Sequence, residues 1–346
     1  MIAGLLLAWL ALPLWAESLR IATFGADLTR RGPGLLLRDI LSGKDPQVAA
    51  VVAVIAAAQA DVLLLTGVDH DHDLVALTAL ADRLAAAGAP YPHRFALPPN
   101  RGLRTGEDLD GDGRPGEAQG FGRFTGAEGM AILSRLPIAA EAARDFSALA
   151  WRDLPGALTG PDVTPAQRLS TTGHWMVPVH LPGGGLLHLL AWHATPPVFD
   201  GGTGRNARRN HDETALWLRL IEGGTGPPTP FVILGNGNLD PADGDGLPGA
   251  MHALLAHPAL QDPQPRSNGG AMAADPAHRG DPALDTADFR DGPGQPGNLR
   301  VDLVLPSAGL RVLDAGVIWP PPGAALAAEA AAASRHRLVW VDLEPP

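Results

Sequence analysis

The chain has 346 residues, of which 45% are hydrophobic and 18% are charged, and it contains no cysteine. This composition excludes a disordered chain and a disulfide-stabilised one, so a packed core must supply the stability. The net charge of −11 makes tight, sequence-independent nucleic-acid binding unlikely, because such binding depends on Lys and Arg neutralising phosphates. The sequence carries no signal for an oligomeric state.

Residues 1–18 are expected to form a signal peptide. An apolar run extends from Leu5 to Trp15 and is followed by Ala16, a suitable cleavage position. Residues 19–346 would then form one mature domain that is periplasmic or secreted. The start of the chain lacks Lys and Arg, so an apolar anchor or a buried first strand is the alternative. No other segment reaches eighteen apolar residues, so no membrane span is expected in the mature chain.

Strand-like and helix-like stretches then alternate. Strands are expected at Leu19–Phe24, Asp61–Thr66, Met130–Ser134, Gly173–Val179, Leu186–Trp192, Phe231–Gly235, Leu299–Leu305, Leu310–Leu313 and Leu338–Leu343. Helices are expected from Pro46 to Ala58 with Asp45 as N-cap, from Leu74 to Ala87 with Asp73 as N-cap, and at Ala207–Glu222, Leu247–Ala256 and Ala324–Ala333. This order predicts an α/β fold in which two mixed sheets pack together with helices outside. Long loops are expected at 98–124 and 263–297.

Polar residues follow several of the predicted strands, in a characteristic order. The segments are Ala22-Thr-Phe24, Asp61 to Thr66, Gly129-Met-Ala-Ile-Leu-Ser-Arg135, His193-Ala-Thr-Pro-Pro-Val-Phe199, Gly235-Asn-Gly-Asn-Leu-Asp-Pro241, Arg300-Val-Asp302 and Ser334-Arg-His-Arg337. Together they resemble the endonuclease/exonuclease/phosphatase superfamily from about residue 18 to the end of the chain. The resemblance implies a four-layer α/β/β/α sandwich with an active-site cup at the strand ends.

The resemblance also implies hydrolysis of phosphodiesters or phosphomonoesters with Mg²⁺. A metal ion of this kind prefers oxygen ligands, polarises the phosphoryl oxygen and lowers the pKa of its bound water. Four positions match the family pattern of catalytic residues: His193, Asn238, Asp302 and His336. Asp302 lies between two valine-containing apolar segments, which favours a buried carboxylate that orients a histidine.

Four other family positions are changed. Gly25 replaces the first-motif Asn, Gly67 the metal-binding Glu, Asn236 the motif Asp, and Arg335 the Asp before the terminal His. With Glu128 aligned at a position often held by Tyr, these changes raise the formal charge of the cup by three. Like charges 4 Å apart repel by roughly 4 kcal/mol at an effective dielectric constant near 20, so ordinary Mg²⁺ binding is not expected.

Two hypotheses follow. In the first, catalysis is lost or weak, and the cup binds a small phosphate-containing or other anionic ligand directly through Arg335, His193, His336 and Asn238. The planar guanidinium of Arg335 suits phosphate. In the second, the protein is an active metal-dependent phosphodiesterase or phosphatase with relocated ligands, for which Asp27, Asp69 and Glu128 are candidates.

Simpler interpretations remain open for several residues. The two histidines of the matching set could be retained with the fold alone, and Asn236 and Asn238 could only stabilise a tight turn. The basic residues Arg205, Arg208 and Arg209 are candidates for an anion clamp or for a solvated helix start.

A calcium loop is also a candidate. Asp108, Asp110 and Asp112 alternate and precede Gly113, as in loops that hold structural Ca²⁺. The twelfth position, where a Glu ligand is expected, is Gln119. An acidic surface loop is the alternative interpretation.

Overall fold

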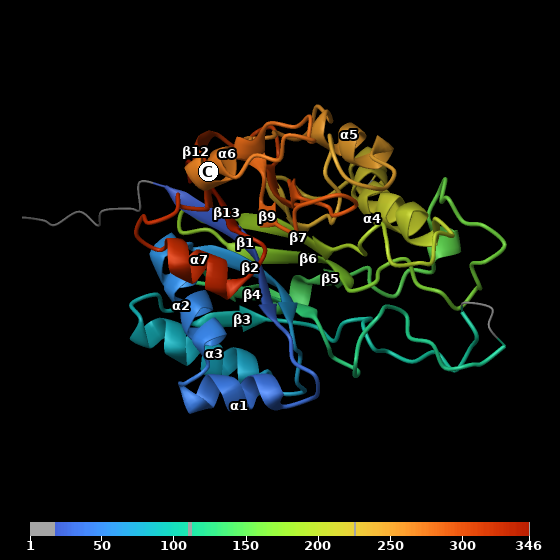
Figure 1. Ribbon diagram of the computed structural model, residues 1–346, viewed down its shortest axis with the longest axis horizontal. Helices are drawn as coiled ribbons and strands as arrows, with labels where there is room; N and C mark the ends of the chain where they lie inside the picture. The colour runs from blue at the N-terminus through green and yellow to red at the C-terminus, as the bar shows by residue number, and fades with distance from the viewer. Residues whose placement is uncertain (1–17, 110–112, 225, 346) are drawn as a thin grey trace, which may run out of the picture.

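Two β-sheets stack face to face, and helices cover the outer face of each (Figure 1). The computed structural model describes residues 18–109, 113–224 and 226–345. The four layers confirm the predicted α/β sandwich with two mixed sheets. The predicted signal peptide lies outside the described residues except for Ser18.

The first sheet has six strands in the order β12-β13-β1-β2-β4-β3. Their bounds are β1 Leu19–Leu28, β2 Val62–Val68, β3 His93–Phe95, β4 Gly129–Ser134, β12 Val312–Ile318 and β13 Leu338–Leu343. Strands β1 and β2 run parallel, whereas β13 pairs antiparallel with β1 and β12 on either side. The sheet therefore joins the two ends of the chain at its centre.

The second sheet has five strands in the order β11-β8-β7-β6-β5, and a two-stranded ribbon pairs β10 with β9. The bounds are β5 Arg144–Asp145, β6 Gly173–His180, β7 Leu186–His193, β8 Phe231–Asn236, β9 Ala287–Asp288, β10 Asn298–Leu299 and β11 Asp302–Pro306. Strand β8 runs parallel to β7 and antiparallel to β11.

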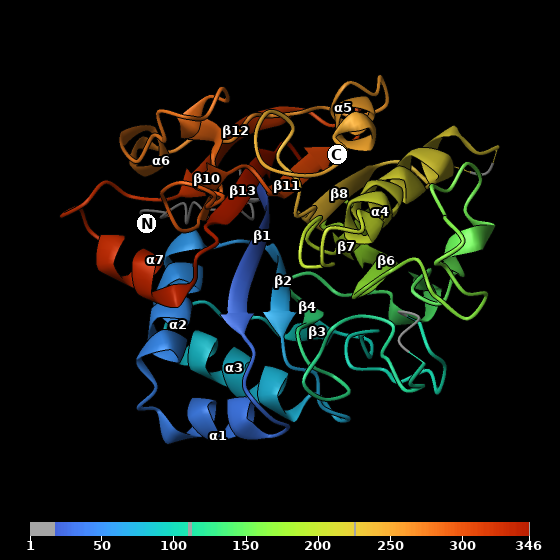
Figure 2. The same cartoon turned by 45° about the vertical axis from the view of Figure 1, so that its right-hand side comes forward.

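The helices form the two outer layers (Figure 2). They are α1 Leu35–Ser42, α2 Pro46–Ala58, α3 Val75–Ala86, α4 Arg205–Glu222, α5 Gly249–Leu255, α6 Asn268–Met272 and α7 Ala327–Ala333, with 3-10 turns at Ala140–Ala142, Trp151–Asp153 and Pro282–Leu284. Helices α1, α2, α3 and α7 lie on the side of the first sheet, and α4 and α5 cover the second. Among the described residues, no single helix is long and apolar enough to cross a membrane.

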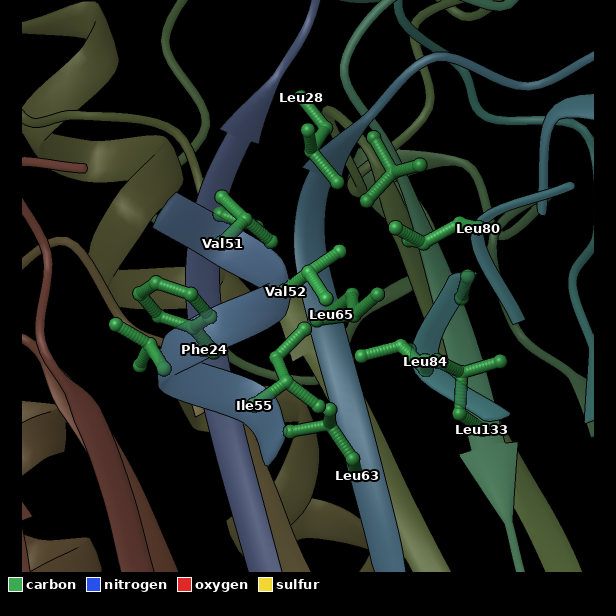
Figure 3. Packing of buried hydrophobic residues seen from close by; sticks show 14 of the residues in the cluster. Phe24, Leu28, Val51, Val52, Ile55, Leu63, Leu65, Leu80, Leu84 and Leu133 are labelled. Carbon is green, nitrogen blue, oxygen red and sulfur yellow. The ribbon is translucent and has the colours of Figure 1, made fainter. Parts of the chain in front are cut away.

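Alternating side chains on the central strands divide the core into layers. In β2, Leu63 and Leu65 face the helices, whereas Val62 and Leu64 face the second sheet. Figure 3 shows the helix side of this core, where Ile55 of α2 packs near Leu63. Because both faces of these strands are buried, they read as continuous apolar runs rather than as alternating polar and apolar residues.

The helix starts test two of the sequence predictions. Asp45 caps α2 as expected, since its carboxylate accepts a hydrogen bond from the Val48 N–H at 2.9 Å. The prediction that Asp73 caps α3 is wrong. The Asp71 carboxylate accepts from the Val75 and Ala76 N–H groups instead, at 2.5 and 2.8 Å, because left-handed Leu74 turns the chain before the helix.

The two long loops differ in content. Residues 98–109 and 113–124 contain no helix or strand, only isolated bridges such as Arg101 with Gly120. The 263–297 segment, predicted as a loop, holds α6, a 3-10 turn and β9. These elements are five residues or shorter, which leaves little hydrophobic periodicity to detect.

Candidate active site

Three polar residues lie side by side at one end of the second sheet. His193 ends β7 and pairs with Asn236 at the end of β8, which pairs in turn with Asp302 at the start of β11. Each continues the face on which Leu189, Val232 and Val304 pack against the first sheet. Because side chains alternate along a strand, all three point into the space between the sheets.

His336 crosses this space from the first sheet. It lies two residues before β13, and its Nδ1 is 2.7 Å from Oδ2 of Asp302. The same oxygen accepts a hydrogen bond from Thr286 Oγ1 at 3.2 Å. The predicted hydrogen bond between a buried Asp302 and a histidine is therefore confirmed. With Nδ1 bound to a carboxylate, Nε2 of His336 is the ring nitrogen left to meet a ligand.

The absence of a side chain at Gly25 leaves room for the imidazole ring of His336. A Cβ built at residue 25 would lie 2.7 Å from Cγ and 2.9 Å from Cβ of His336, closer than such atoms approach in proteins. The ring thus fills the volume that a side chain at this position of β1 would occupy. On the other edge of the imidazole, Phe289 makes an edge contact with a centroid distance of 5.5 Å.

The surroundings shift the pKa values of the two histidines in opposite directions. Burial disfavours the charged form of His336, but the Asp302 carboxylate and its hydrogen bond outweigh that effect, with a contribution from Asp27, and the pKa of His336 is raised. Burial lowers the pKa of His193 well below its ordinary value, and the positive charges of Arg101 and His336 lower it further. The surroundings thus favour the imidazolium form of His336 and the neutral form of His193.

Arg101 is a site residue that the sequence analysis missed. Its side chain is buried, with Nε donating to Thr172 Oγ1 at 2.8 Å and Nη1 donating to Glu128 Oε2 at 2.7 Å. Nη2 makes no hydrogen bond with any described residue, so it remains a donor for a ligand near His193. Arg101 lies in the long loop without a motif, so no local sequence signal marks it.

The two asparagines after β8 build a tight turn. Oδ1 of Asn236 accepts a hydrogen bond from the Asn238 N–H at 2.7 Å, and Nδ2 of Asn238 donates to the Ala194 carbonyl at 2.7 Å. Asn238 has a φ of 49°, in the left-handed region. Both therefore stabilise the turn, as the simpler interpretation held, while Nδ2 of Asn236 makes no hydrogen bond with the described residues.

Arg335 lies at the rim. Its side chain is exposed, and its guanidinium carbon lies 5.6 Å from the centroid of the Phe289 ring. It makes no ion pair or side-chain hydrogen bond with a described residue. A stacked guanidinium is held in orientation while its five N–H donors stay available.

Helix α4 fixes the loops on which His193 depends. The buried Glu213 accepts hydrogen bonds from the N–H groups of Thr171 and Thr195, both at 2.6 Å, and so joins the segment before β6 to the one after β7. One turn earlier, Nδ2 of Asn210 donates to the carbonyls of Thr195 and Gly237, at 2.7 and 2.8 Å. These two side chains escaped the sequence analysis because nothing in α4 sets them apart from ordinary polar helix residues.

The three arginines of the candidate clamp already have protein partners. Arg209 is buried and donates to the carbonyls of Leu169, Gln119, Arg168 and Ser170. Burial lowers its pKa to about 10. Arg208 pairs with Asp162 at 2.7 Å, and Arg205 donates to the Leu109 carbonyl at 2.8 Å. An anion clamp made by these residues stays a prediction.

Comparison with known proteins identifies the fold family. The profile of the Endonuclease/Exonuclease/phosphatase family matches residues 39–336. The chain belongs to this family. A search of curated protein sequences gives no match.

Solved structures with this family's fold cover almost the whole chain. An endonuclease/exonuclease/phosphatase from Beutenbergia cavernae aligns with a TM-score of 0.58 and 19% identity, over 95% of this chain and 72% of its own. A family protein from Leptotrichia buccalis aligns at 0.51 and 14%, over 94% and 99%. A mannosyl-6-phosphatase from Bacteroides thetaiotaomicron aligns at 0.51 and 15%, over 94% and 99%. At these identities, the likeness concerns the fold.

Members of the Endonuclease/Exonuclease/phosphatase family commonly use a divalent metal ion such as Mg²⁺. The residues of this cup do not form a binding site for a divalent metal ion. Gly25 and Gly67 offer no side chain, and Gly67 has a φ of 71°, which disfavours any other residue there. Asn236 and Arg335 likewise offer no carboxylate. Among the described residues, no group of three or more His, Asp or Glu side chains is arranged to hold a metal.

The relocated-ligand candidates are held by hydrogen bonds to protein groups. Asp27 accepts from Ser334 Oγ at 3.1 Å, on the His336 side of the cup. Asp69 is turned toward the loop after β1, where it accepts from Thr29 Oγ1 at 2.7 Å, and Glu128 pairs with Arg101. Oδ1 of Asp69 also accepts from the backbone N–H of Glu128 at 3.2 Å, so these two residues are neighbours. Among the described residues, the three carboxylates still form no metal cage.

Of the candidate calcium loop, Asp110 and Asp112 lie outside the described residues. Oδ2 of Asp108 accepts a hydrogen bond from the Gly113 N–H at 2.8 Å, which closes the loop. Gln119, at the twelfth position, is buried and donates to the Ala166 carbonyl at 2.7 Å. Calcium binding stays a prediction for this loop.

Proposed function

We propose that the cup binds the phosphate group of a small ligand directly through side chains, and that hydrolysis is lost or weak. One observation carries the proposal: the His336–Asp302 pair is intact, while the ring of His336 occupies the space above Gly25 where the family pattern has a side chain. The site has kept its phosphate-facing histidine and lost the oxygen ligands of a metal.

The donors around the cup support an anionic ligand. Nε2 of His336, Nδ2 of Asn236 and the guanidinium of Arg101 are the inner donors, and the guanidinium of Arg335 adds a charge at the rim. Hydrogen bonds between charged donors and phosphate oxygens are short and strong. A relative with this fold is a mannosyl-6-phosphatase, and a phosphate ester is the kind of ligand that these donors suit.

Phosphate binding is tested by thermal melting. Inorganic phosphate is expected to raise the melting temperature of the wild-type protein, and Arg335→Ala is expected to reduce this shift. Arg311→Ala is the matched control, because Arg311 is exposed and pairs with Glu344 at the other end of β13. If phosphate shifts neither the wild type nor the variants, the binding proposal is wrong.

Hydrolysis is tested with phosphodiester and phosphomonoester substrates in Mg²⁺, Mn²⁺ and Ca²⁺. The proposal expects turnover near background. Robust turnover that His193→Ala abolishes would overturn lost catalysis and favour the active enzyme with relocated ligands. In that case, a loss of turnover in Asp27→Asn or in Glu128→Gln would identify the carboxylate that binds the metal ion.

We also propose export to the periplasm or beyond the cell, on the apolar run before Ala16. Expression of the full chain in a bacterial host, followed by N-terminal sequencing of the exported fraction, is expected to give a mature chain that begins near Glu17. Recovery of only the uncleaved chain inside the cell would contradict export.

Calcium binding by the Asp108 loop is a separate proposal. It is supported by the alternating carboxylates and by the bond that closes the loop at Gly113. Calorimetry is expected to detect heat of binding at millimolar Ca²⁺, and Asp108→Asn is expected to reduce it. An absence of heat for the wild type would exclude the site.

A further inference from the structure

A large cavity adjoins the cup. It has a volume of about 990 Å³ and is lined by the 102–109 and 116–125 segments, by the 199–203 turn and by the start of α4. Gly102, which follows Arg101, lines it, and so does Thr195, two residues after His193. Nη1 of Arg101 also lies 3.4 Å from the Phe121 carbonyl, so one side chain reaches from the cup to the cavity wall. Pockets for small organic ligands reach about this volume.

Two phenylalanines of this cavity are open to solvent. Phe199 is 90% exposed and Phe121 is 73% exposed, the two highest fractions among the large hydrophobic residues described. An isolated exposed phenyl group is common on a protein surface. Two exposed phenyl groups on the wall of one cavity, both beside the candidate site, can contact the same ligand.

Phe199 is also held in an unfavourable backbone conformation. Its φ is 70°, which is rare for a bulky residue and persists only where the surroundings impose it. The neighbouring residues do impose it: Nδ2 of Asn206 donates to the Val198 carbonyl at 2.7 Å, and the Asp200 carboxylate accepts from the N–H groups of Gly202 and Asn206. The turn therefore presents an exposed phenyl ring from a fixed backbone.

The rest of the lining is polar and basic. Five arginines and three carboxylates line the cavity, a formal excess of two positive charges in a chain whose net charge is −11. Arg123 is exposed and makes no side-chain hydrogen bond or ion pair with a described residue. Arg104, Arg205, Arg208 and Arg209 already bond to protein groups, so Arg123 is the lining arginine that can donate to a ligand. A flat aromatic ring with polar edges offers a face to phenylalanine and hydrogen-bonding atoms to this arginine.

We propose that the cavity binds the organic part of a phosphate ester that carries a flat aromatic ring, as a nucleobase does, with Phe199 and Phe121 as stacking surfaces. This inference rests on the proposed function, because the phosphate of the same ligand would occupy the cup of His336 and Arg335. A small ligand fits better than a polymer, since the net charge of −11 on the chain repels a polyanion.

The inference is tested by calorimetry in EDTA with three probes that differ by one part each: inorganic phosphate, ribose 5-phosphate and AMP. AMP is expected to bind the wild type about tenfold more tightly than ribose 5-phosphate, the order expected for one stacked base. Phe199→Ala and Phe121→Ala are expected to reduce this ratio toward one. Met272→Ala is the matched control, because Met272 is 69% exposed on α6 and does not line the cavity.

The outcomes separate the two proposals. If AMP and ribose 5-phosphate bind the wild type equally, or if the phenylalanine variants keep the tenfold ratio, the aromatic inference is wrong while phosphate binding stands. If inorganic phosphate does not bind but AMP does, and Phe199→Ala weakens AMP, the cavity is supported and the phosphate cup is not. If no probe binds, both proposals fail.

Discussion

The imidazole of His336 lies directly against the Cα of Gly25, so that a Cβ at residue 25 would fall 2.7 Å from its Cγ. Gly25, which departs from the expected family pattern, and His336, which matches it, therefore form one structural arrangement. The loss of a side chain at residue 25 and the position of the ring that binds Asp302 depend on each other.

The first prediction follows from this contact. Gly25→Asn, which restores the residue of the family pattern, is expected to destabilise the protein by about 1–3 kcal/mol, the usual cost of overpacking a buried site. It is not expected to create metal-dependent stabilisation. Urea unfolding with and without Mg²⁺ measures both quantities.

A double-mutant cycle supplies the control. In a His336→Gly background, Gly25→Asn should cost much less, because both clashing atoms, Cγ and Cβ of His336, are gone. Equal costs in the two backgrounds would show that the ring does not set the limit at residue 25.

The second prediction concerns pH. His336 has a raised native pKa, so its stabilising contribution is complete below its unfolded pKa near 6.5 and is lost as the pH rises through the native value. Phosphate affinity should fall over the same interval, since the donor loses its proton. His193 behaves in the opposite way: its lowered pKa costs stability as the pH falls below about 6.5.

NMR titration of the imidazole signals checks this contrast. His336 should titrate above 6.5 and His193 should stay neutral well below it. Asp302→Asn should lower the His336 midpoint, whereas the conservative exposed change Glu344→Gln should not. A common midpoint for both histidines would contradict the assignment of charge states.

The third prediction concerns Asp285, a buried residue beside the Asp240 turn. Burial and the neighbouring carboxylates of Asp240, Asp243 and Asp281 raise its pKa to about 7, although His278 acts in the opposite direction. An acid with a raised native pKa costs stability as the pH rises from its unfolded value near 3.8 through about 7. Asp285→Asn should therefore raise the melting temperature at pH 8 and have little effect at pH 4.

Asp281→Asn serves as the comparison for this change. The hydrogen bond from Arg266 holds the pKa of Asp281 below its usual value, so the neutral variant should lose stability at pH 8. A melting temperature that falls for Asp285→Asn at pH 8 would mean that the charged carboxylate is stabilising.

The fourth prediction concerns the contact of α4 with the loops beside His193. Glu213→Gln keeps the shape of the side chain but places an NH₂ group opposite a backbone N–H of Thr171 or Thr195. A buried donor without an acceptor costs about 1–3 kcal/mol. The variant should be destabilised by this order, and amide exchange at Thr195 should accelerate.

Glu222→Gln is the control on the same helix, because Glu222 is half exposed and pairs only with Arg219. Its stability should stay within about 0.5 kcal/mol of the wild type. Equal protection of the Thr195 amide in Glu213→Gln and the wild type would contradict the clamping role of Glu213.

The sequence predicted the fold because its signal is spread along the whole chain. Ordered strand ends and continuous apolar runs do not depend on any one residue, and the pairing of Asp302 with a histidine followed from its apolar neighbours. The site was harder to predict. Arg101 and Glu213 lie far from the strand ends in sequence, and only the tertiary fold brings them to His193.

Local signals failed where a single backbone conformation decided the outcome. The prediction of Asp73 as a helix cap assumed that α3 starts at Leu74, but the left-handed conformation of Leu74 shifts the start and gives the role to Asp71. The steric link between Gly25 and His336 was equally hidden, because residues 311 positions apart show no relation in sequence.

Strand β13 is the last strand of the first sheet to leave the ribosome, yet it lies between β12 and β1 at the centre of that sheet. Until it is synthesised, β1 has one open edge and His336 is absent from the site. Pairing residues more than 300 positions apart is an entropically costly, late step of folding. A nascent chain therefore lacks both this strand and the site histidine until residues 336–343 have been synthesised.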